Sequence, residues 1–135
     1  MHASRVDSFL DATLVFGREA QVYLLGMDDM TEQLHERMAG AFQFYLEGIE
    51  RALEHHSHIA GDMITIADIA FACDVSQFLR ERLMSKGLEP LSLPMVSASL
   101  EAAYPGAYAH LLELIERPEF SQHLDAYTQH FRNPG

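Results

Sequence analysis

The sequence predicts an all-α protein, a bundle of five or six helices that forms a single domain over residues 1–135. Apolar residues recur every three or four positions, which is the period of a helix that buries one face. No segment of useful length alternates strictly between apolar and polar residues, as a half-buried β-strand would. The hydrophobic content is 48%, and a chain of 135 residues can bury a core without disulfides or metals.

A first helix is predicted from Ser4 to about Leu25, because the periodic apolar residues follow Ser4 and end at Gly26. Ser4 and Asp7 also have the spacing of a capping box. One side of the helix carries the expected core residues Val6, Phe9, Leu10, Phe16, Ala20, Tyr23 and Leu24. The opposite side mixes apolar and charged residues, namely Asp11, Val15, Arg18, Val22 and Leu25.

A second helix is predicted over residues 34–53, where one apolar stripe contains Leu34, Met38, Phe42, Tyr45, Leu46, Ile49 and Leu53. Gly40 and Gly48 lie inside it, and close approach by a neighbouring helix would explain them. The histidines of His55-His56-Ser57-His58 follow the helix. We interpret them as part of a solvated loop, because no cysteine or carboxylate completes an evident set of metal ligands.

A third helix is predicted from Thr65 to about Leu83, and it is expected to be the central, most buried helix because residues 66–73 are apolar nearly all round. Thr65 and Asp68 are predicted to form a capping box, in which each side chain accepts from the other residue's backbone N–H. Ile64 and Ile69 are predicted to form a hydrophobic staple across this cap. The cap explains Asp68 better than acid catalysis does, and Cys73 is expected to pack in the core.

The rest of the chain is predicted to hold a loop over residues 85–103, with a short helix through Val96 to Ala103. Pro105 opens another helix, which Arg117-Pro118 ends because a residue before proline avoids helical geometry. Pro118 can then begin a last helix, whose inward residues would be Phe120, Leu124, Tyr127 and Phe131.

The charge balance disfavours two classes of partner. Nine basic residues stand against twenty acidic ones, and the net charge of -11 repels both nucleic-acid phosphates and anionic membranes. No apolar run has the length of a membrane span, and no signal peptide is recognisable. A single cysteine excludes an internal disulfide and fits a reducing compartment, so a cytoplasmic location is expected.

The segment Ala60-Gly61-Asp62, followed after two residues by Thr65-Ile66-Ala67-Asp68, resembles the C-terminal domain of glutathione S-transferases. In that family it forms the capped start of a buried helix. Weaker similarities occur in the family's order and extend the resemblance over nearly the whole chain: Arg5 to Leu10, Tyr104-Pro105-Gly106 and Arg117-Pro118-Glu119-Phe120. The family's thioredoxin-like domain, which binds glutathione and activates its thiol, has no counterpart here.

The resemblance implies a role within a transferase. The domain would supply a hydrophobic pocket for the electrophile and contacts for a dimer, and alone it would have no activity and bind no cofactor. Glutathione would bind only with a thioredoxin-like domain present, so the expected partner is that domain or a second copy of the chain. The family's first helix lines the pocket, which makes Asp11, Val15, Arg18 and Val22 the candidate substrate-binding residues. A solvent-exposed helix face that carries two valines without a binding function explains the same residues equally well.

Two other interpretations remain open. Domains that resemble this one also serve as assembly modules in translation factors and aminoacyl-tRNA synthetase complexes, without enzymatic activity. A helical ligand-binding domain unrelated to the family is the third interpretation. A thioredoxin-like sequence encoded upstream of Met1 would favour the enzyme. A true start codon at Met1 would favour the assembly module.

Overall fold

The computed structural model describes residues 2–118, and the side chains of residues 5–118. It contains α1 (His2–Leu25), α2 (Glu32–His55), α3 (Ile66–Phe78), α4 (Leu100–Ala103) and α5 (Pro105–Ile115). Short 3-10 helices connect them: η1 (Met27–Asp29), η2 (Leu79–Leu83), η3 (Ser85–Leu91) and η4 (Val96–Ser99). No β-strand occurs in the described range, so the predicted all-α class is confirmed. The predicted last helix, with Phe120, Leu124, Tyr127 and Phe131, lies outside the described residues.

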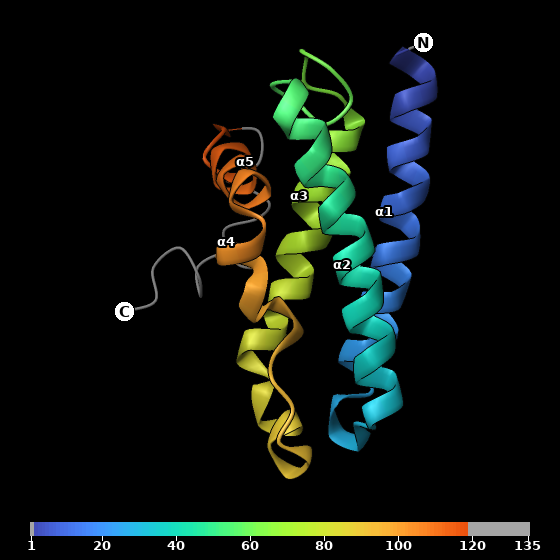
Figure 1. Ribbon diagram of the computed structural model, residues 1–135, viewed down its shortest axis with the longest axis vertical. Coiled ribbons are helices and arrows are strands. Elements are labelled where there is room, and N and C mark those ends of the chain that lie inside the picture. Colours follow the sequence, from blue (N-terminus) through green and yellow to red (C-terminus); the bar gives the residue numbers. More distant parts are fainter. Residues whose placement is uncertain (1, 119–135) are drawn as a thin grey trace.

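The three long helices lie side by side along the long axis of the molecule, with α4 and α5 on the side away from α1 (Figure 1). α1 packs against α2 and α3, and α5 packs against the same two helices. Their shared core is rich in aromatic rings. Phe16 stacks on Tyr45 with ring centroids 4.7 Å apart, and it forms a T-shaped pair with Phe78, with ring centroids 5.5 Å apart. Because these rings come from α1, α2 and α3, the bundle has one common core.

The helix boundaries agree with the sequence at some ends and differ at others. α1 begins at His2 rather than Ser4, so Ser4 lies inside the helix and is not its cap. Its end before Gly26 is as predicted, and the Gly26 amide donates to the carbonyls of Val22 and Tyr23. α2 begins earlier than predicted, because the Thr31 hydroxyl caps it and accepts from the Leu34 amide at 3.1 Å.

α3 is central, as predicted, but it is not buried on every side. Phe71, Ala72 and Val75 are completely buried, because α1 and α5 both pack against this helix. Ile66 and Ile69 are 56% and 43% exposed, since no described element covers the outer face of its first half. Residues 66–73 therefore have an exposed side, contrary to what their apolar composition implied, although α3 buries a larger share of its residues than α2 does, as predicted. An apolar helix face can be buried in a core or left open, and the sequence pattern is the same in both cases.

The two glycines inside α2 do not mark a close approach between helices. A Cβ built on Gly40 or Gly48 has no neighbouring atom within 4 Å, so that prediction was wrong. Gly87 provides the contrast, because a Cβ there would lie 2.5 Å from the Met27 carbonyl oxygen. The close approach that requires glycine is thus between η3 and η1, and Gly48 instead leaves open space beside α2.

Two acidic side chains, one on α2 and one on η2, hold the irregular C-terminal half in place. Glu50 of α2 accepts hydrogen bonds from the Gly106 and Ala107 amides, at 2.9 and 2.7 Å, and so caps the start of α5. Glu81 of η2 is completely buried and accepts from the Val96 amide at the start of η4. The predicted short helix through Val96 to Ala103 is present as η4 and α4.

Candidate functional site

The capping box predicted at the start of α3 is present. The Asp68 carboxylate accepts from the Thr65 amide at 2.9 Å, and the Thr65 hydroxyl accepts from the Ala67 amide at 3.2 Å. Ile64 and Ile69 flank this cap and keep 36% and 43% of their surface exposed, so their predicted staple stays a prediction.

Asp68 also has partners that the cap does not account for. Its Oδ1 accepts from the Ile59 amide at 3.1 Å and lies 2.8 Å from Nε2 of His110 on α5. Burial raises the pKa of Asp68, but the hydrogen bonds from His110, Thr65 and Ile59 outweigh it, and the net pKa is lowered. Because the carboxylate is fully enclosed, it fastens the loop before α3 and α5 to the helix start rather than meeting a ligand.

The histidine cluster is only partly a solvated loop. His55 is the last residue of α2 and is exposed. His56 caps that helix, with Nε2 3.1 Å from Nη1 of Arg5 and Nδ1 3.5 Å from Oδ1 of Asp62. Because Arg5 can only donate, Nε2 accepts and the proton of neutral His56 sits on Nδ1. His58 is half-buried, with its ring edge-on to His110 at 5.6 Å. Among residues 2–118 no group of His, Cys, Asp and Glu side chains could hold a metal.

The four candidate substrate-binding residues share the outer face of α1 but do not share one cavity. Asp11, Val15, Arg18 and Val22 are all exposed, as expected of the face opposite the core. Asp11 and Val15 border a small hollow of about 220 Å³. Arg18 borders a separate groove of about 530 Å³ between α1 and α3, and Val22 lines neither.

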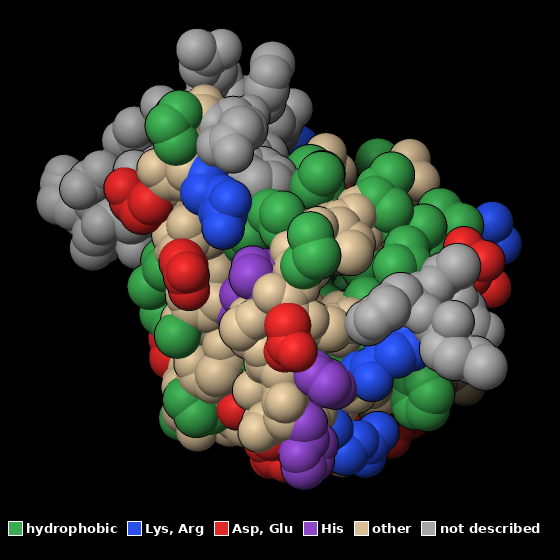
Figure 2. Space-filling view, turned by 90° about the horizontal axis from the view of Figure 1, so that it is seen from above, with side chains coloured by type: hydrophobic (Ala, Val, Ile, Leu, Met, Phe, Trp, Pro, Cys, Tyr) green, Lys and Arg blue, Asp and Glu red, His purple; other side chains and the backbone are tan. Residues whose placement is uncertain are grey.

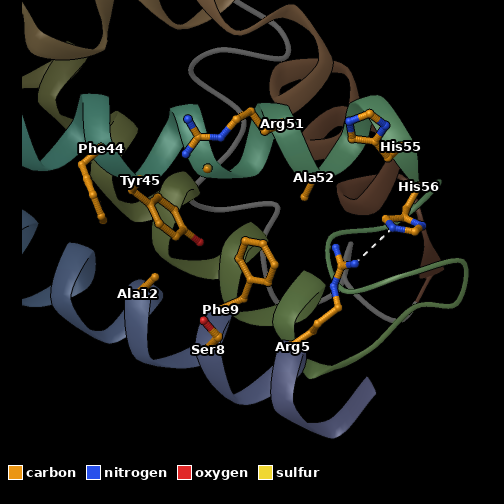
Figure 3. A pocket seen from close by; sticks show the side chains of 11 residues that line it. Arg5, Ser8, Phe9, Ala12, Phe44, Tyr45, Arg51, Ala52, His55 and His56 are labelled. Carbon is orange, nitrogen blue, oxygen red and sulfur yellow. Dashed lines mark hydrogen bonds between the residues drawn. The ribbon is translucent and has the colours of Figure 1, made fainter. Parts of the chain in front are cut away.

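A different pocket lies between the N-terminal half of α1 and the C-terminal half of α2 (Figure 3), with a volume of about 490 Å³. In Figure 3, Arg5 and Phe9 extend from α1 towards α2. The pocket has an apolar floor formed by Phe9, Ala12, Tyr45 and Ala52. Phe44 stands at the edge with 77% of its surface exposed.

The rest of the lining is rich in nitrogen and contains no acid. Arg5, Arg51, His55 and His56 line the pocket, and no acidic residue within residues 5–118 does. Within the described residues, neither Arg5 nor Arg51 forms an ion pair with a carboxylate. Figure 2 looks onto this end of the molecule and shows Arg and His side chains gathered together, with hydrophobic side chains on the adjoining surface.

Two local features shape this pocket. Gly48 lines it and has no side chain, so the space beside α2 stays empty. Tyr45 is fixed beneath it: the Thr13 hydroxyl donates to the Phe9 carbonyl at 2.8 Å, so the Tyr45 hydroxyl donates to Thr13 at 2.7 Å. Burial is the main cause that raises the pKa of Tyr45, which therefore remains a neutral donor.

Sequence reasoning missed this pocket, although its signal is present. Phe44, Gly48, Arg51 and His55 follow a spacing of four, three and four, and therefore share one face of α2. Arg5, Phe9 and Ala12 have similar spacing on α1. Each helix alone shows only an ordinary polar and aromatic face, so the pocket becomes evident once the two faces are brought together.

Comparison with models of known protein families, with curated proteins and with solved structures finds no match to the chain. The resemblance to glutathione S-transferases therefore depends on residues 60–68 and on the order of the weaker similarities around them. In the part of the chain that the structure describes, every helix is too short or too polar to cross a lipid bilayer.

Proposed function

We propose that the chain is a helical domain of the glutathione S-transferase C-terminal type, which binds a small apolar ligand and catalyses no reaction alone. The pocket between α1 and α2 carries this proposal. Its volume of about 490 Å³ lies within the range of roughly 300–1,000 Å³ that is usual for ligand pockets. An apolar floor with a few polar groups between helices of a bundle is also usual for such sites.

The pocket lining supports binding rather than nucleophilic catalysis. Its possible general bases are His55 and His56, because no carboxylate of the described residues lines it, but no cysteine lines it to act as a nucleophile. Cys73 lies on α3 and does not line it, and burial, then the charge of Asp74, raises the pKa of its thiol. A thiol with a raised pKa is a poor nucleophile at neutral pH. Conjugation of glutathione would require the thioredoxin-like domain, with this chain holding the electrophile.

Calorimetry with 4-phenylbutanol, a neutral aromatic probe, tests the pocket. The wild-type chain is expected to bind it, and Gly48→Leu is expected to weaken binding at least about tenfold by filling the open space, a loss of about 1.4 kcal/mol. Gly40→Leu is the matched control, because Gly40 also has open space around it on α2 but does not line the pocket. Both variants replace a helical glycine and should fold well.

Two results would contradict the proposal. The first is no binding by the wild-type chain, and the second is equal binding by Gly48→Leu and Gly40→Leu. Glutathione should show no measurable binding to this chain, and micromolar affinity for it would contradict the need for a second domain.

An assembly module is the second candidate, which the exposed apolar residues favour. Ile66 and Ile69 of α3 are 56% and 43% exposed, and Leu14 of α1 is 65% exposed. On the outer face of α1, Val15, Val22 and Leu25 are 60%, 41% and 80% exposed. Apolar side chains grouped on a surface favour association, here with a thioredoxin-like domain or a second copy.

Sedimentation equilibrium at tens of micromolar protein tests self-association. We expect a two-fold dimer that strengthens with added salt, because two chains of net charge -11 repel each other. Val15→Asp or Val22→Asp should dissociate a dimer formed through α1, and Ile66→Asp one formed through α3. A monomer mass at every salt concentration would rule out self-association, leaving the other domain as the partner.

A further inference from the structure

On the basis of the function proposed for the α1–α2 pocket, we propose that its ligand is an acid. The ligand would be a small molecule with an aromatic or aliphatic body and one carboxylate, which Arg5 and Arg51 hold at the edge of the pocket.

The distribution of charge is the first argument. Acidic residues outnumber basic ones twenty to nine in the chain, yet two arginines and no acid line this pocket in the part of the chain that the structure describes. The two arginines are distant in sequence and come from different helices, α1 and α2. Neither guanidinium forms an ion pair with a carboxylate of the described residues, and a bound anion would supply the missing negative charge. A chain of net charge -11 also needs such a local arrangement to attract an anion.

The position of Arg5 is the second argument. Its Nη1 donates to Nε2 of His56 at 3.1 Å, and His56 is itself the C-cap of α2. One edge of the guanidinium is thereby fixed, while a guanidinium has five N–H donors in a planar fork that matches a carboxylate. Arg51 is exposed on α2, where it also borders a separate hollow with Glu47 and Glu50. It forms no ion pair with a carboxylate of the described residues, so it can add a second positive charge to the pocket.

The apolar floor is the third argument and defines the rest of the ligand. Phe9 and Ala12 come from α1, and the Tyr45 hydroxyl below them is already bonded to Thr13. The floor therefore offers an apolar surface and no free polar group. Phe44 at the edge is 77% exposed, and a ligand body lying across it would remove apolar surface from water. A floor of this kind suits a hydrocarbon body better than a sugar or a polyphosphate.

Calorimetry on the full chain at low salt, comparing 4-phenylbutyrate with 4-phenylbutanol, tests whether the pocket prefers a ligand with a carboxylate. The two probes share one body and differ in the charged group. The acid is expected to bind at least about tenfold more tightly, and its affinity should fall with added salt while that of the alcohol stays constant. Inorganic phosphate, an anion without an apolar body, should not displace 4-phenylbutyrate.

Arginine substitutions test whether Arg5 and Arg51 provide the positive charge that binds the carboxylate. Arg5→Ala and Arg51→Ala are each expected to weaken 4-phenylbutyrate about tenfold and to weaken 4-phenylbutanol much less. Arg18→Ala is the control, because Arg18 is an arginine of α1 that lines the separate groove and should change the binding of neither probe. Continued binding of the alcohol also shows that each arginine variant keeps a folded pocket.

The possible outcomes separate this inference from the proposed function. Equal affinity for 4-phenylbutanol and 4-phenylbutyrate would contradict the inference that the ligand is an acid, but it would agree with the proposed function of the pocket. Binding of neither probe would contradict the proposed function itself. Displacement of 4-phenylbutyrate by phosphate, or an equal loss of both probes in the arginine variants, would also overturn the inference.

Discussion

Two completely buried carboxylates, Asp68 at the start of α3 and Glu81 just beyond its end, perform the same task with different partners. Asp68 accepts from two backbone amides and contacts the His110 ring. Glu81 accepts from the Val96 and Ser97 amides, at 2.7 and 2.9 Å, and from the Tyr23 hydroxyl at 2.5 Å. One partner of Asp68 is three residues away, whereas the nearest partner of Glu81 is fifteen residues away. The first carboxylate can be recognised in the sequence, and the second cannot.

The two carboxylates also differ in how the free-energy cost of burying them is compensated. A buried carboxylate has to be compensated by hydrogen bonds or an opposite charge, because burial removes its hydration. Asp68 has a partner that can carry a positive charge, His110, whereas the side-chain partner of Glu81 is a neutral hydroxyl. Burial, then the nearby Glu81, raises the pKa of Tyr23 and keeps that hydroxyl protonated.

The largest effect is expected for Asp68→Ala. It removes the acceptor for the Thr65 and Ile59 amides and leaves His110 buried without its acidic partner. Each buried donor left without its acceptor typically costs about 1–3 kcal/mol, so the total loss should exceed about 3 kcal/mol. Urea unfolding measures the loss, with Asp62→Ala as the control, since that side chain is 81% exposed and should change stability by less than about 0.5 kcal/mol. A loss of only about 1 kcal/mol for Asp68→Ala would mean that the cap alone matters.

A smaller loss, about 1–3 kcal/mol, is expected for Glu81→Gln. The substitution keeps the shape but replaces one accepting oxygen with an NH₂ group, so a buried amide of Val96 or Ser97 loses its acceptor. Hydrogen exchange at these two amides should accelerate, since the start of η4 is held by Glu81. Glu89→Gln, at an exposed site, is the control. Unchanged exchange at Val96 and Ser97 would show that Glu81 does not hold η4.

The sequence predicted much of the fold because helix periods and caps are local. The start of α3, the end of α1 at Gly26 and the break after α5 were all predicted from neighbouring residues. The open outer face of α3 was not predicted, because an apolar residue such as Ile66 gives the same sequence pattern in a core and on an open surface. The hydrogen bonds of Glu81 were not predicted either, since they depend on how distant segments pack.

The α1–α2 pocket was not predicted, for the same reason. The exposed face of α1 with Asp11, Val15, Arg18 and Val22 was predicted correctly, but residues that share a face need not share a cavity. The α1–α2 pocket depends on two faces meeting, which neither helix encodes by itself. Gly48 was noticed in the sequence, but its open surroundings were mistaken for a close contact.

A double-mutant cycle separates the local part of the Asp68 network from the distant part. Thr65→Ala and Asp68→Ala should destabilise less than additively, with a coupling of about 1 kcal/mol, because both break the same cap. The remainder of the Asp68→Ala loss then belongs to Ile59 and His110. Strictly additive losses in urea would show that Thr65 and Asp68 do not act as one cap.

The smallest expected effect is a pH dependence that reports the charge on Asp68. Its pKa is lowered in the folded protein, so its contribution to stability is complete above the pKa of the unfolded chain, about 3.9. As the pH falls further, the unfolded chain takes up a proton before the folded protein does, and this contribution is lost. The stability advantage of the wild type over Asp68→Asn should therefore shrink as the pH falls below about 4.

Asp74, on the same helix, gives the control with the opposite sign. Burial raises its pKa, so its charge destabilises the folded protein at neutral pH. Asp74→Asn should accordingly be more stable than the wild type at pH 7, and the difference should vanish below about pH 4, where Asp74 is protonated in both states. Urea unfolding of the three proteins between pH 3 and pH 7 measures both trends. A constant difference between wild type and Asp68→Asn over this range would mean that folding does not lower the pKa of Asp68.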